Sequence, residues 1–281
     1  MHAGRPELPQ SSDPLILTVA PNGARRQPAD HPALPLSPET LADTARRCLD
    51  AGAAMLHLHL RDAQGRHSLD VEGYREALRV VRSAVGEAMV LQVTSEAAQR
   101  YRPAQQIAML RTLRPEALSV ALRELDQPEI GDAGLAAFFH ALAARRAMTQ
   151  VILYDLTDLQ RWQALRRAGT VPEAPWFLLF VLGRHSATHV SDPRELLPFV
   201  QAHDGPEAWA TCAFGPAEHA CVATAAALGG HVRVGFENNL HLRDGTVAPD
   251  NAALVRQVTE LAGALGRKLA SAAQIRERFG A

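Results

Sequence analysis

Two histidines that lie two residues apart are the first feature of this sequence that could carry chemistry. His57 and His59 lie in the segment Ala54–Asp62, which reads as a short apolar strand bounded by Gly52 and a polar turn. Side chains on a strand alternate between its two faces, so both imidazoles point to the same side. Neutral imidazole is the commonest metal ligand, and two on one face can hold a single ion. The pattern equally fits two hydrogen-bonded histidines that line a core.

A carboxylate would complete an open catalytic zinc site, in which two imidazoles and one carboxylate leave a position for water or substrate. Glu237 is the candidate, because the strand before it is expected to lie close to the histidine strand. Taken alone, Glu237 would be read as a solvated loop residue. Asp62 and Asp155 are poorer candidates for the same ligand position that the sequence leaves open.

Eight alternating strand and helix segments are expected to position these residues. Short apolar runs predict strands at Leu15–Ala20, Ala54–Asp62, Met89–Thr94, Ala117–Ala121, Gln150–Tyr154, Trp176–Leu182, Ala208–Ala213 and His231–Gly235. Amphipathic stretches between them predict helices, the first beginning at the capping sequence Ser37–Thr40 and the last covering Asn251–Leu265. Eight such pairs over about 250 residues predict a (β/α)8 TIM barrel. It would span residues 15–281 as one domain, after a loose tail over residues 1–14.

An open, doubly wound sheet is the structural alternative. It is disfavoured because Ala20–Gly23, directly after the first strand, is not a glycine-rich phosphate fingerprint. In a barrel, active sites lie at the carboxyl ends of the strands. The polar residues expected at that rim are His57, His59, Thr94, Ser95, Tyr154, Asp155, Arg233, Glu237, Asn238 and Asn239.

Composition narrows the classes of function. The formal net charge of −1 provides no global field for nucleic acid or an anionic membrane. No apolar run reaches the roughly 18 residues of a membrane span, and the polar N-terminal segment, which has no apolar stretch, is not expected to be a signal peptide. Three scattered cysteines, Cys48, Cys212 and Cys221, suggest reduced thiols and a cytoplasmic protein. We therefore expect a small-molecule substrate and neither nucleic acid nor membrane as partner.

Several blocks of the sequence together resemble one known family, the β-keto acid cleavage enzymes, typified by 3-keto-5-aminohexanoate cleavage enzyme. The resemblance covers nearly the whole chain. The blocks that carry it are Leu17–Gly23 (LTVAPNG), His31–Pro38 (HPALPLSP), Ala51–Asp62 (AGAAMLHLHLRD), Phe180–Gly183 (FVLG) and Gly229–Asn239 (GGHVRVGFENN), with a closing helix like Asn251–Gly266.

The resemblance implies a zinc-dependent barrel that converts a β-keto acid and acetyl-CoA into acetoacetate and a new acyl-CoA. It implies zinc ligands at His57, His59 and Glu237, in agreement with the reading of the residues themselves. It also implies a homotetramer. Catalytic positions fall on Thr94, Asp155, Arg233 and Asn238, and substrate contacts are expected from Asn22, Arg25 and Ser95.

Departures from the family pattern concern the substrate rim. Asn238 stands where the family usually has an aspartate that is a candidate general base, and an amide cannot take a proton. Arg25 stands where members acting on amino substrates carry an acidic residue. We therefore expect a substrate whose distal part is neutral or anionic. The glycine-rich loop usual after the third strand is replaced by Ser95–Ala98.

Two other functions fit the same metal ligands. One is an aldolase or hydrolase that uses the metal without CoA, and the other is an inactive barrel that retains zinc and binds a metabolite. A second histidine pair, His185 and His189, has a spacing that suits a metal on a helix, but solvated loop histidines are the simpler reading. His219 and His231 are expected to be structural.

Overall fold

Eight parallel strands close into a barrel in the computed structural model of this chain, which describes residues 13–184 and 190–280. The order around the barrel is β1-β10-β9-β8-β7-β6-β5-β2. The strands are β1 (Leu17–Val19), β2 (Met55–Leu58), β5 (Val90–Thr94), β6 (Ala117–Ala121), β7 (Met148–Leu153), β8 (Phe177–Leu182), β9 (Ala208–Ala213) and β10 (His231–Val234). The predicted (β/α)8 fold is confirmed. His185, His189 and residues 1–12 of the expected tail lie outside the described residues.

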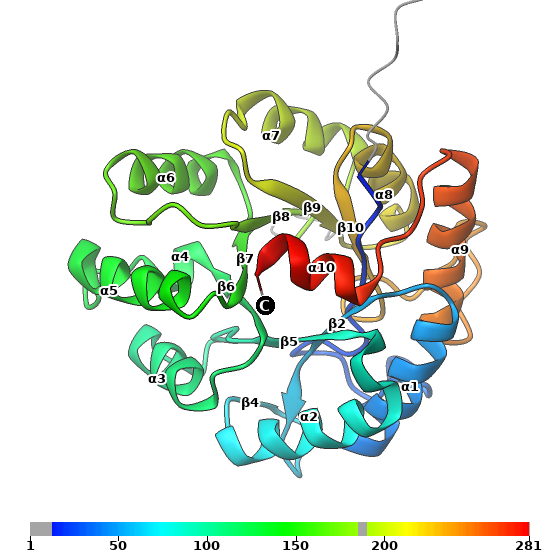
Figure 1. The fold of residues 1–281 in the computed structure, drawn as a ribbon. Coiled ribbons are helices and arrows are strands. Elements are labelled where there is room, and N and C mark those ends of the chain that lie inside the picture. Colours follow the sequence, from blue (N-terminus) through cyan, green and yellow to red (C-terminus); the bar gives the residue numbers. More distant parts are fainter. Residues whose placement is uncertain (1–12, 185–189, 281) are drawn as a thin grey trace, which may run out of the picture.

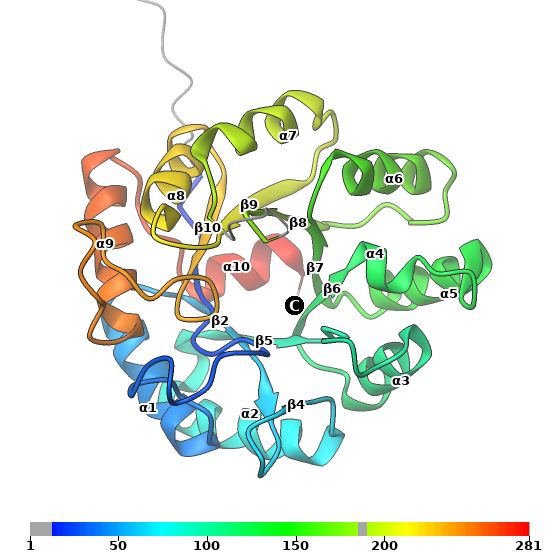
Figure 2. The same cartoon turned by 180° about the vertical axis from the view of Figure 1, so that it is seen from behind.

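Helices surround the strands on the outside of the barrel (Figures 1 and 2). Several begin where the sequence supplies a cap: the Ser37 side chain accepts from the backbone of Thr40, and Pro38 occupies the first turn. The helices are α1 (Pro38–Asp50), α2 (Val71–Val85), α3 (Pro103–Leu113), α4 (Leu122–Leu125), α5 (Gly131–Ala144), α6 (Leu156–Arg167), α7 (Leu196–Ala202), α8 (Glu218–Ala227), α9 (Asn251–Ala264) and α10 (Ala272–Phe279), with 3-10 turns η1 (Gly86–Ala88) and η2 (Pro193–Glu195). Every described helix falls short of the length and apolar character needed to cross a membrane.

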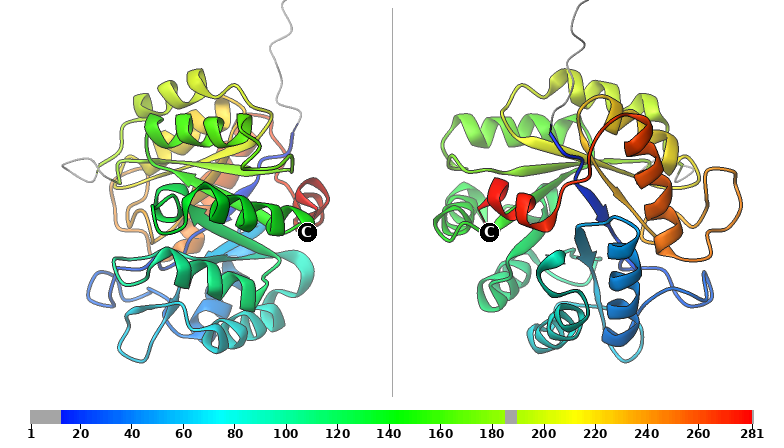
Figure 3. Two further views of the ribbon diagram at one scale, coloured as in Figure 1. Left: turned by 90° about the vertical axis from the view of Figure 1, so that its left-hand side faces the viewer. Right: turned by 45° about the vertical axis from the view of Figure 1, so that its right-hand side comes forward.

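Helix α10, which the sequence analysis did not anticipate, lies across one end of the barrel (Figures 1 and 3). Its buried residues Ala272, Ile275 and Phe279 pack with residues from the amino ends of the strands, and the rings of Phe279 and Phe177 lie 5.0 Å apart. This helix closes the amino-terminal end of the barrel. The carboxyl ends of the strands therefore remain as the face where a site can form.

The histidine segment does not continue as one strand to Asp62, as the sequence analysis expected. Strand β2 ends at Leu58, and after His59 the chain enters a short hairpin in which β3 (Leu60–Arg61) pairs antiparallel with β4 (His67–Ser68). The Asn22 side chain brackets His59 where β2 ends, since its amide nitrogen donates to the His59 carbonyl at 2.9 Å and its oxygen accepts from the His59 N–H at 3.2 Å. The backbone at this histidine is thus fixed by a residue that follows β1.

Candidate metal centre and pocket

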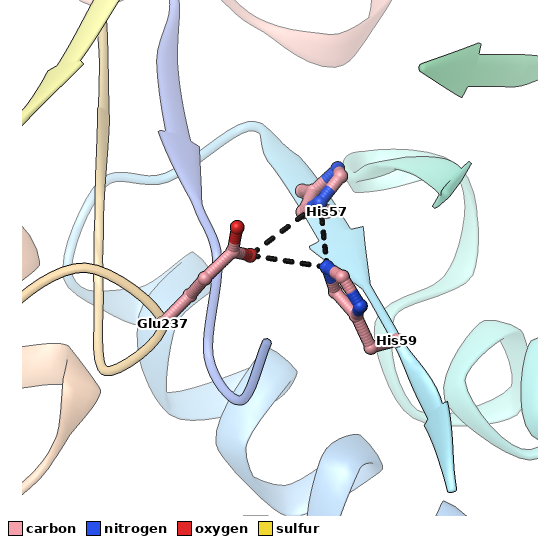
Figure 4. Close-up of side chains that lie close together, drawn as sticks. All are labelled: His57, His59 and Glu237. Atoms are coloured by element: carbon pink, nitrogen blue, oxygen red, sulfur yellow. Dashed lines mark hydrogen bonds and ion pairs between the residues drawn. The ribbon is translucent and has the colours of Figure 1, made fainter. Parts of the chain in front are cut away.

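His57, His59 and Glu237 converge at the carboxyl ends of β2 and β10, with their side chains pointing toward one another (Figure 4). The two Nε2 atoms lie 3.1 Å apart. The Glu237 Oε2 atom lies 3.3 Å from Nε2 of His59 and 3.5 Å from Nε2 of His57. Three potential ligand atoms from segments far apart in sequence therefore meet in one place.

These distances fit a tetrahedral metal ion. Ligand bonds of about 2.1 Å at tetrahedral angles separate two ligand atoms by about 3.4 Å, close to the three observed separations. Oε2 of Glu237 is buried, and it finds no hydrogen-bond partner among the described residues. A buried carboxylate oxygen without a partner is costly unless something else satisfies it, and a cation would do so.

Electrostatics favour the protonation states that a metal requires. Burial lowers the pKa of His57 to about 3, so its imidazole is neutral near pH 7. Burial also opposes ionisation of Glu237, but Arg233 above all, and then His59 and His57, hold the pKa of its carboxyl well below the usual range. Neutral imidazole and ionised carboxylate are the forms that bind a metal.

Two glycines allow the chain to bring Glu237 beside the histidines. Gly235, directly after β10, has φ of 138°, and a Cβ there would lie 2.3 Å from the carbonyl oxygen of Ala20. A Cβ on Gly23, whose φ is 62°, would lie 2.7 Å from the Glu237 side chain. The turns after β1 and β10 can pack this closely only because both positions lack a side chain.

Arg233 of β10 is buried beside the carboxylate of Glu237. Its Nη2 atom donates to Oε1 of Glu237 at 3.0 Å and contacts Sγ of Cys212 at 3.3 Å. Its Nε and Nη1 atoms are buried and find no partner within the described part of the chain. A guanidinium with N–H groups still to be satisfied in a pocket wall is suited to carboxylate or enolate oxygens.

One open pocket at the carboxyl-terminal rim contains the three convergent residues. Its wall combines four arginines and two carboxylates with backbone and apolar groups. The lining residues are Asn22, Gly23, Ala24, Arg25, Arg26, His57, His59, Thr94, Glu96, Ala121, Ile152, Tyr154, Val181, Arg184, Phe214, Arg233 and Glu237.

Three other residues predicted from the sequence belong to this pocket wall. Thr94 ends β5, and its hydroxyl accepts from the backbone N–H of Glu96 at 3.1 Å. Arg25 lies at the mouth, half exposed, and its Nη1 atom lies 3.1 Å from Oε1 of Glu96. Asn22 also lines the pocket, but its side-chain amide is engaged with the backbone of His59.

The structure does not bring the remaining three predicted residues into the described pocket wall. Asp155 is about half exposed, because its carboxylate caps the start of α6 and pairs with Arg123 at 2.5 Å. Ser95 is buried, and its hydroxyl donates to the carbonyl of Ser119. Asn238 follows the carboxylate of Glu237 but is fully buried in the turn after β10.

Three charged residues and one phenol of the pocket wall were given no role in the sequence analysis. Glu96 lies between the ends of Arg25 and Arg184, with Oε1 of Glu96 3.9 Å from Nη2 of Arg184, and its Oε2 is 3.8 Å from Nδ1 of His59. The only sequence signal was its place directly after the hydroxyl pair that ends a strand. Arg26 and Arg184 lie on loops, where the sequence does not indicate in which direction a side chain points. Tyr154 was placed at the rim but given no role; burial raises its phenol pKa well above the usual value.

The two histidines expected to be structural are not among the residues that line the pocket. His231 accepts through Nδ1 from the backbone N–H of Ile16 at 3.0 Å, and burial lowers its pKa to about 3. His231 therefore links β10 to the residue directly before β1 through a buried hydrogen bond. The part of the prediction that concerns His231 is consistent with this contact.

The closed parallel barrel, with a candidate metal centre at its carboxyl-terminal rim, places this chain in the class of TIM-barrel proteins. Comparison with known families narrows that class: the sequence profile of the beta-keto acid cleavage enzymes matches residues 14–280. The chain belongs to the β-keto acid cleavage enzyme family.

Characterised relatives align with the chain over almost its full length. The 3-oxoadipate:acetyl-CoA acetyltransferase of Cupriavidus necator is 29% identical over 96% of this chain and 95% of its own. The 3-keto-5-aminohexanoate cleavage enzyme of Fusobacterium nucleatum is 26% identical over 94% of this chain and 96% of its own. A solved ternary complex of ObcA with a C4-CoA adduct and oxalate has the same fold, with a TM-score of 0.71 and 20% identity over 89% of this chain and 68% of that one.

Proposed function

We propose that this chain is a zinc-dependent enzyme that cleaves a β-keto acid by acyl exchange with acetyl-CoA, giving acetoacetate and a new acyl-CoA. The observation that carries the proposal is the group formed by His57, His59 and Glu237, with ligand-like spacing, in the wall of an open pocket. The family assignment and the names of the aligned relatives support the reaction class. Two imidazoles and a carboxylate are a set that zinc uses in catalytic sites. When bound, zinc would act as a Lewis acid on the keto acid and stabilise its enolate.

The proposed reaction exchanges one carbon–carbon bond for another. The α-carbon of the β-keto acid loses a proton and attacks the thioester carbon of acetyl-CoA, which releases the CoA thiolate. The thiolate then attacks the original keto carbon, and cleavage of the bond to the α-carbon leaves a new acyl-CoA and, after protonation, acetoacetate. No external oxidant or reductant is needed.

Arg233 is the proposed anchor for the substrate's oxygens. Its buried guanidinium has a fixed planar arrangement of donors, and only part of that arrangement is engaged by Glu237 and Cys212. Tyr154 lines the same pocket and is the second proposed donor, because a phenol keeps its proton near neutral pH and burial here raises its pKa further. Thr94 adds a hydroxyl to the same wall.

Glu96 is the proposed proton acceptor. The carboxylates lining the described pocket are Glu237, which is assigned to the metal, and Glu96. Asn238, at the position where the family pattern has its candidate base, carries an amide and is fully buried. A general base must lie in the pocket within reach of the substrate's α-carbon, and Glu96 is the lining carboxylate that is not assigned to the metal.

Charge supports a substrate that lacks a distal cation. Four guanidiniums line the described pocket, from Arg25, Arg26, Arg184 and Arg233, against the two carboxylates of Glu96 and Glu237. A bound zinc ion would add to the positive excess. The name of one aligned relative specifies a substrate with a second carboxylate, 3-oxoadipate, and we propose a neutral or anionic tail here. Arg25 is paired with Glu96, so its charge acts together with that carboxylate and not alone.

A cytoplasmic homotetramer is the proposed state of the protein. All three cysteines are buried and unpaired, which fits a reducing compartment. The tetramer rests on the family resemblance, and light scattering of the purified protein tests it: a particle of 30.4 kDa would refute any oligomer.

Elemental analysis of protein purified without a histidine tag tests the metal assignment. We expect one zinc per chain in the wild type and none in the His57→Ala/His59→Ala double variant. Zinc at undiminished stoichiometry in the double variant would refute the assignment of these ligands.

A further inference from the structure

Gln92 contacts the ring nitrogen of His57 that is turned away from the other two candidate ligands. The two residues are register partners on the neighbouring strands β2 and β5, and both are fully buried. Oε1 of Gln92 lies 2.7 Å from Nδ1 of His57, while the opposite ring nitrogen, Nε2, faces His59 and Glu237. Gln92 therefore touches a ligand without being one.

The other end of the Gln92 amide fixes which of its atoms faces His57. Its Nε2 atom lies 3.4 Å from the carbonyl oxygen of Leu118 and 3.4 Å from Oε1 of Gln150. A backbone carbonyl can only accept, so the amide NH2 group must face Leu118 and the amide oxygen must face His57. An amide oxygen can likewise only accept. The hydrogen of the neutral His57 ring is therefore on Nδ1, and Nε2 presents a lone pair to the other two ligands.

We propose that Gln92 is a positioning residue that locks His57 in the Nδ1–H tautomer before the metal arrives, and thereby sets the affinity of the site for zinc. This inference rests on the proposed metal site and adds a residue that carries none of the ligand atoms. Hydrogen-bond partners behind ligating histidines fix ring orientation and tautomer, and their loss typically costs 10–100-fold in metal affinity.

The choice of an amide has its own consequence. A carboxylate in this place would make His57 a more basic ligand and would leave a second negative charge buried in the metal-free barrel. The neutral Gln92 orients the ring without adding charge. A cation bound by His57 would therefore keep its ability to withdraw electrons from the substrate. Gln150 of β7 extends this chain of contacts across the barrel interior, because its Oε1 atom lies 3.4 Å from Nε2 of Gln92.

Zinc affinity of three variants, measured by competition with a chromogenic chelator, tests the proposal. Gln92→Leu removes the acceptor and should bind zinc 10–100-fold more weakly than the wild type. Gln92→Glu restores an acceptor and should bind at least as tightly as the wild type. Gln150→Leu, a matched change of a buried amide one contact further away, should stay within a few-fold of the wild type. Thermal unfolding of each metal-free variant separates lost affinity from lost folding.

Nitrogen-15 NMR of the metal-free wild type gives a test that needs no variant to fold. The His57 ring should carry its hydrogen on Nδ1, and a ring protonated on Nε2 alone would overturn the proposal. Equal zinc affinity of Gln92→Leu and the wild type would also overturn it, as would equal losses in Gln92→Leu, Gln92→Glu and Gln150→Leu, which indicate a general packing role. A wild type that binds no zinc would instead refute the proposed metal site, and the NMR result would still decide the tautomer.

Discussion

Breaking the buried pair of Arg233 and Glu237 should destabilise the metal-free protein strongly, from either side. The side chains of the two residues are 3% and 12% exposed, and the atoms Nη2 and Oε1 lie 3.0 Å apart. In Arg233→Met the carboxylate stays buried without its main partner, and in Glu237→Gln the guanidinium does. Removal of one partner from a buried ion pair costs about 3–5 kcal/mol in the free energy of unfolding.

The double variant distinguishes this explanation from loss of packing. With both charges removed, neither is left unpaired. The loss of unfolding free energy in the double variant should therefore fall short of the sum of the two single losses by about 0.5–3 kcal/mol. Arg46→Met is a control on the surface, where Arg46 pairs with Asp50 at 3.1 Å and both side chains are more than half exposed. That variant should change the free energy of unfolding by less than about 1 kcal/mol.

Urea unfolding in the presence of a chelator measures the wild type and all four variants under the same conditions. In a second series with zinc in place of the chelator, Arg233→Met should regain part of its lost stability, because the cation would supply a new partner for Glu237. Two results would show that the buried charges of Arg233 and Glu237 do not stabilise each other. One is additive losses of unfolding free energy in the double variant, and the other is an Arg233→Met protein as stable as the Arg46→Met control.

Three further predictions concern the pocket and the turn that carries Glu237. Glu96→Gln should lower kcat by at least 100-fold with zinc content unchanged, since a lost general base typically costs 10²–10⁴-fold; an unaffected kcat would remove Glu96 from proton transfer. Arg25→Ala should reduce the preference for carboxylate-tailed over amino-tailed β-keto acids in kcat/KM, and a wild type that prefers the amino-tailed compound would contradict the charge argument. Glu218 accepts from the backbone N–H of Gly235 at 3.3 Å, at the start of the turn that carries Glu237. Burial raises the pKa of Glu218 to about 8, so the folded protein retains a proton that the unfolded chain releases above about pH 4.5. The stabilising contribution of this proton is full below about pH 4.5 and is lost as pH rises toward 8. In metal-free protein, Glu218→Gln should therefore lose less stability than the wild type between pH 5 and pH 8, and parallel losses in urea unfolding would refute this reading.

The barrel fold could be predicted from the sequence because its strands are short apolar runs separated by helices with recognisable caps. The predicted strands Ala117–Ala121 and Ala208–Ala213 coincide with β6 and β9, and the predicted last helix Asn251–Leu265 matches α9 to within one residue. These elements need only local patterns to be found. Helix α10 was missed, although Ser271 caps it, because its eight residues give too short a pattern to separate from a polar tail.

The candidate site could be predicted from the sequence only in part, for a physical reason. The shared direction of His57 and His59 follows from strand geometry alone, and closure of the barrel then brings Glu237 near. Gln92 shows what could not be predicted from the sequence. It is one amide in an apolar strand, and its meaning depends on His57 and Leu118, which lie on neighbouring strands. Asp155 shows the opposite case, because a carboxylate after a strand can cap the following helix as readily as it can face the pocket.

Isotopic labelling of the products tests the proposed reaction most directly. Zinc-loaded enzyme is incubated with a β-keto acid and acetyl-CoA carrying carbon-13 in its acetyl group, and the products are analysed by mass spectrometry. The label should appear in acetoacetate, with unlabelled acyl groups transferred to CoA, and the His57→Ala/His59→Ala variant should form neither product. Cleavage that proceeds equally well without acetyl-CoA, or that persists in the double variant, would contradict the proposed function.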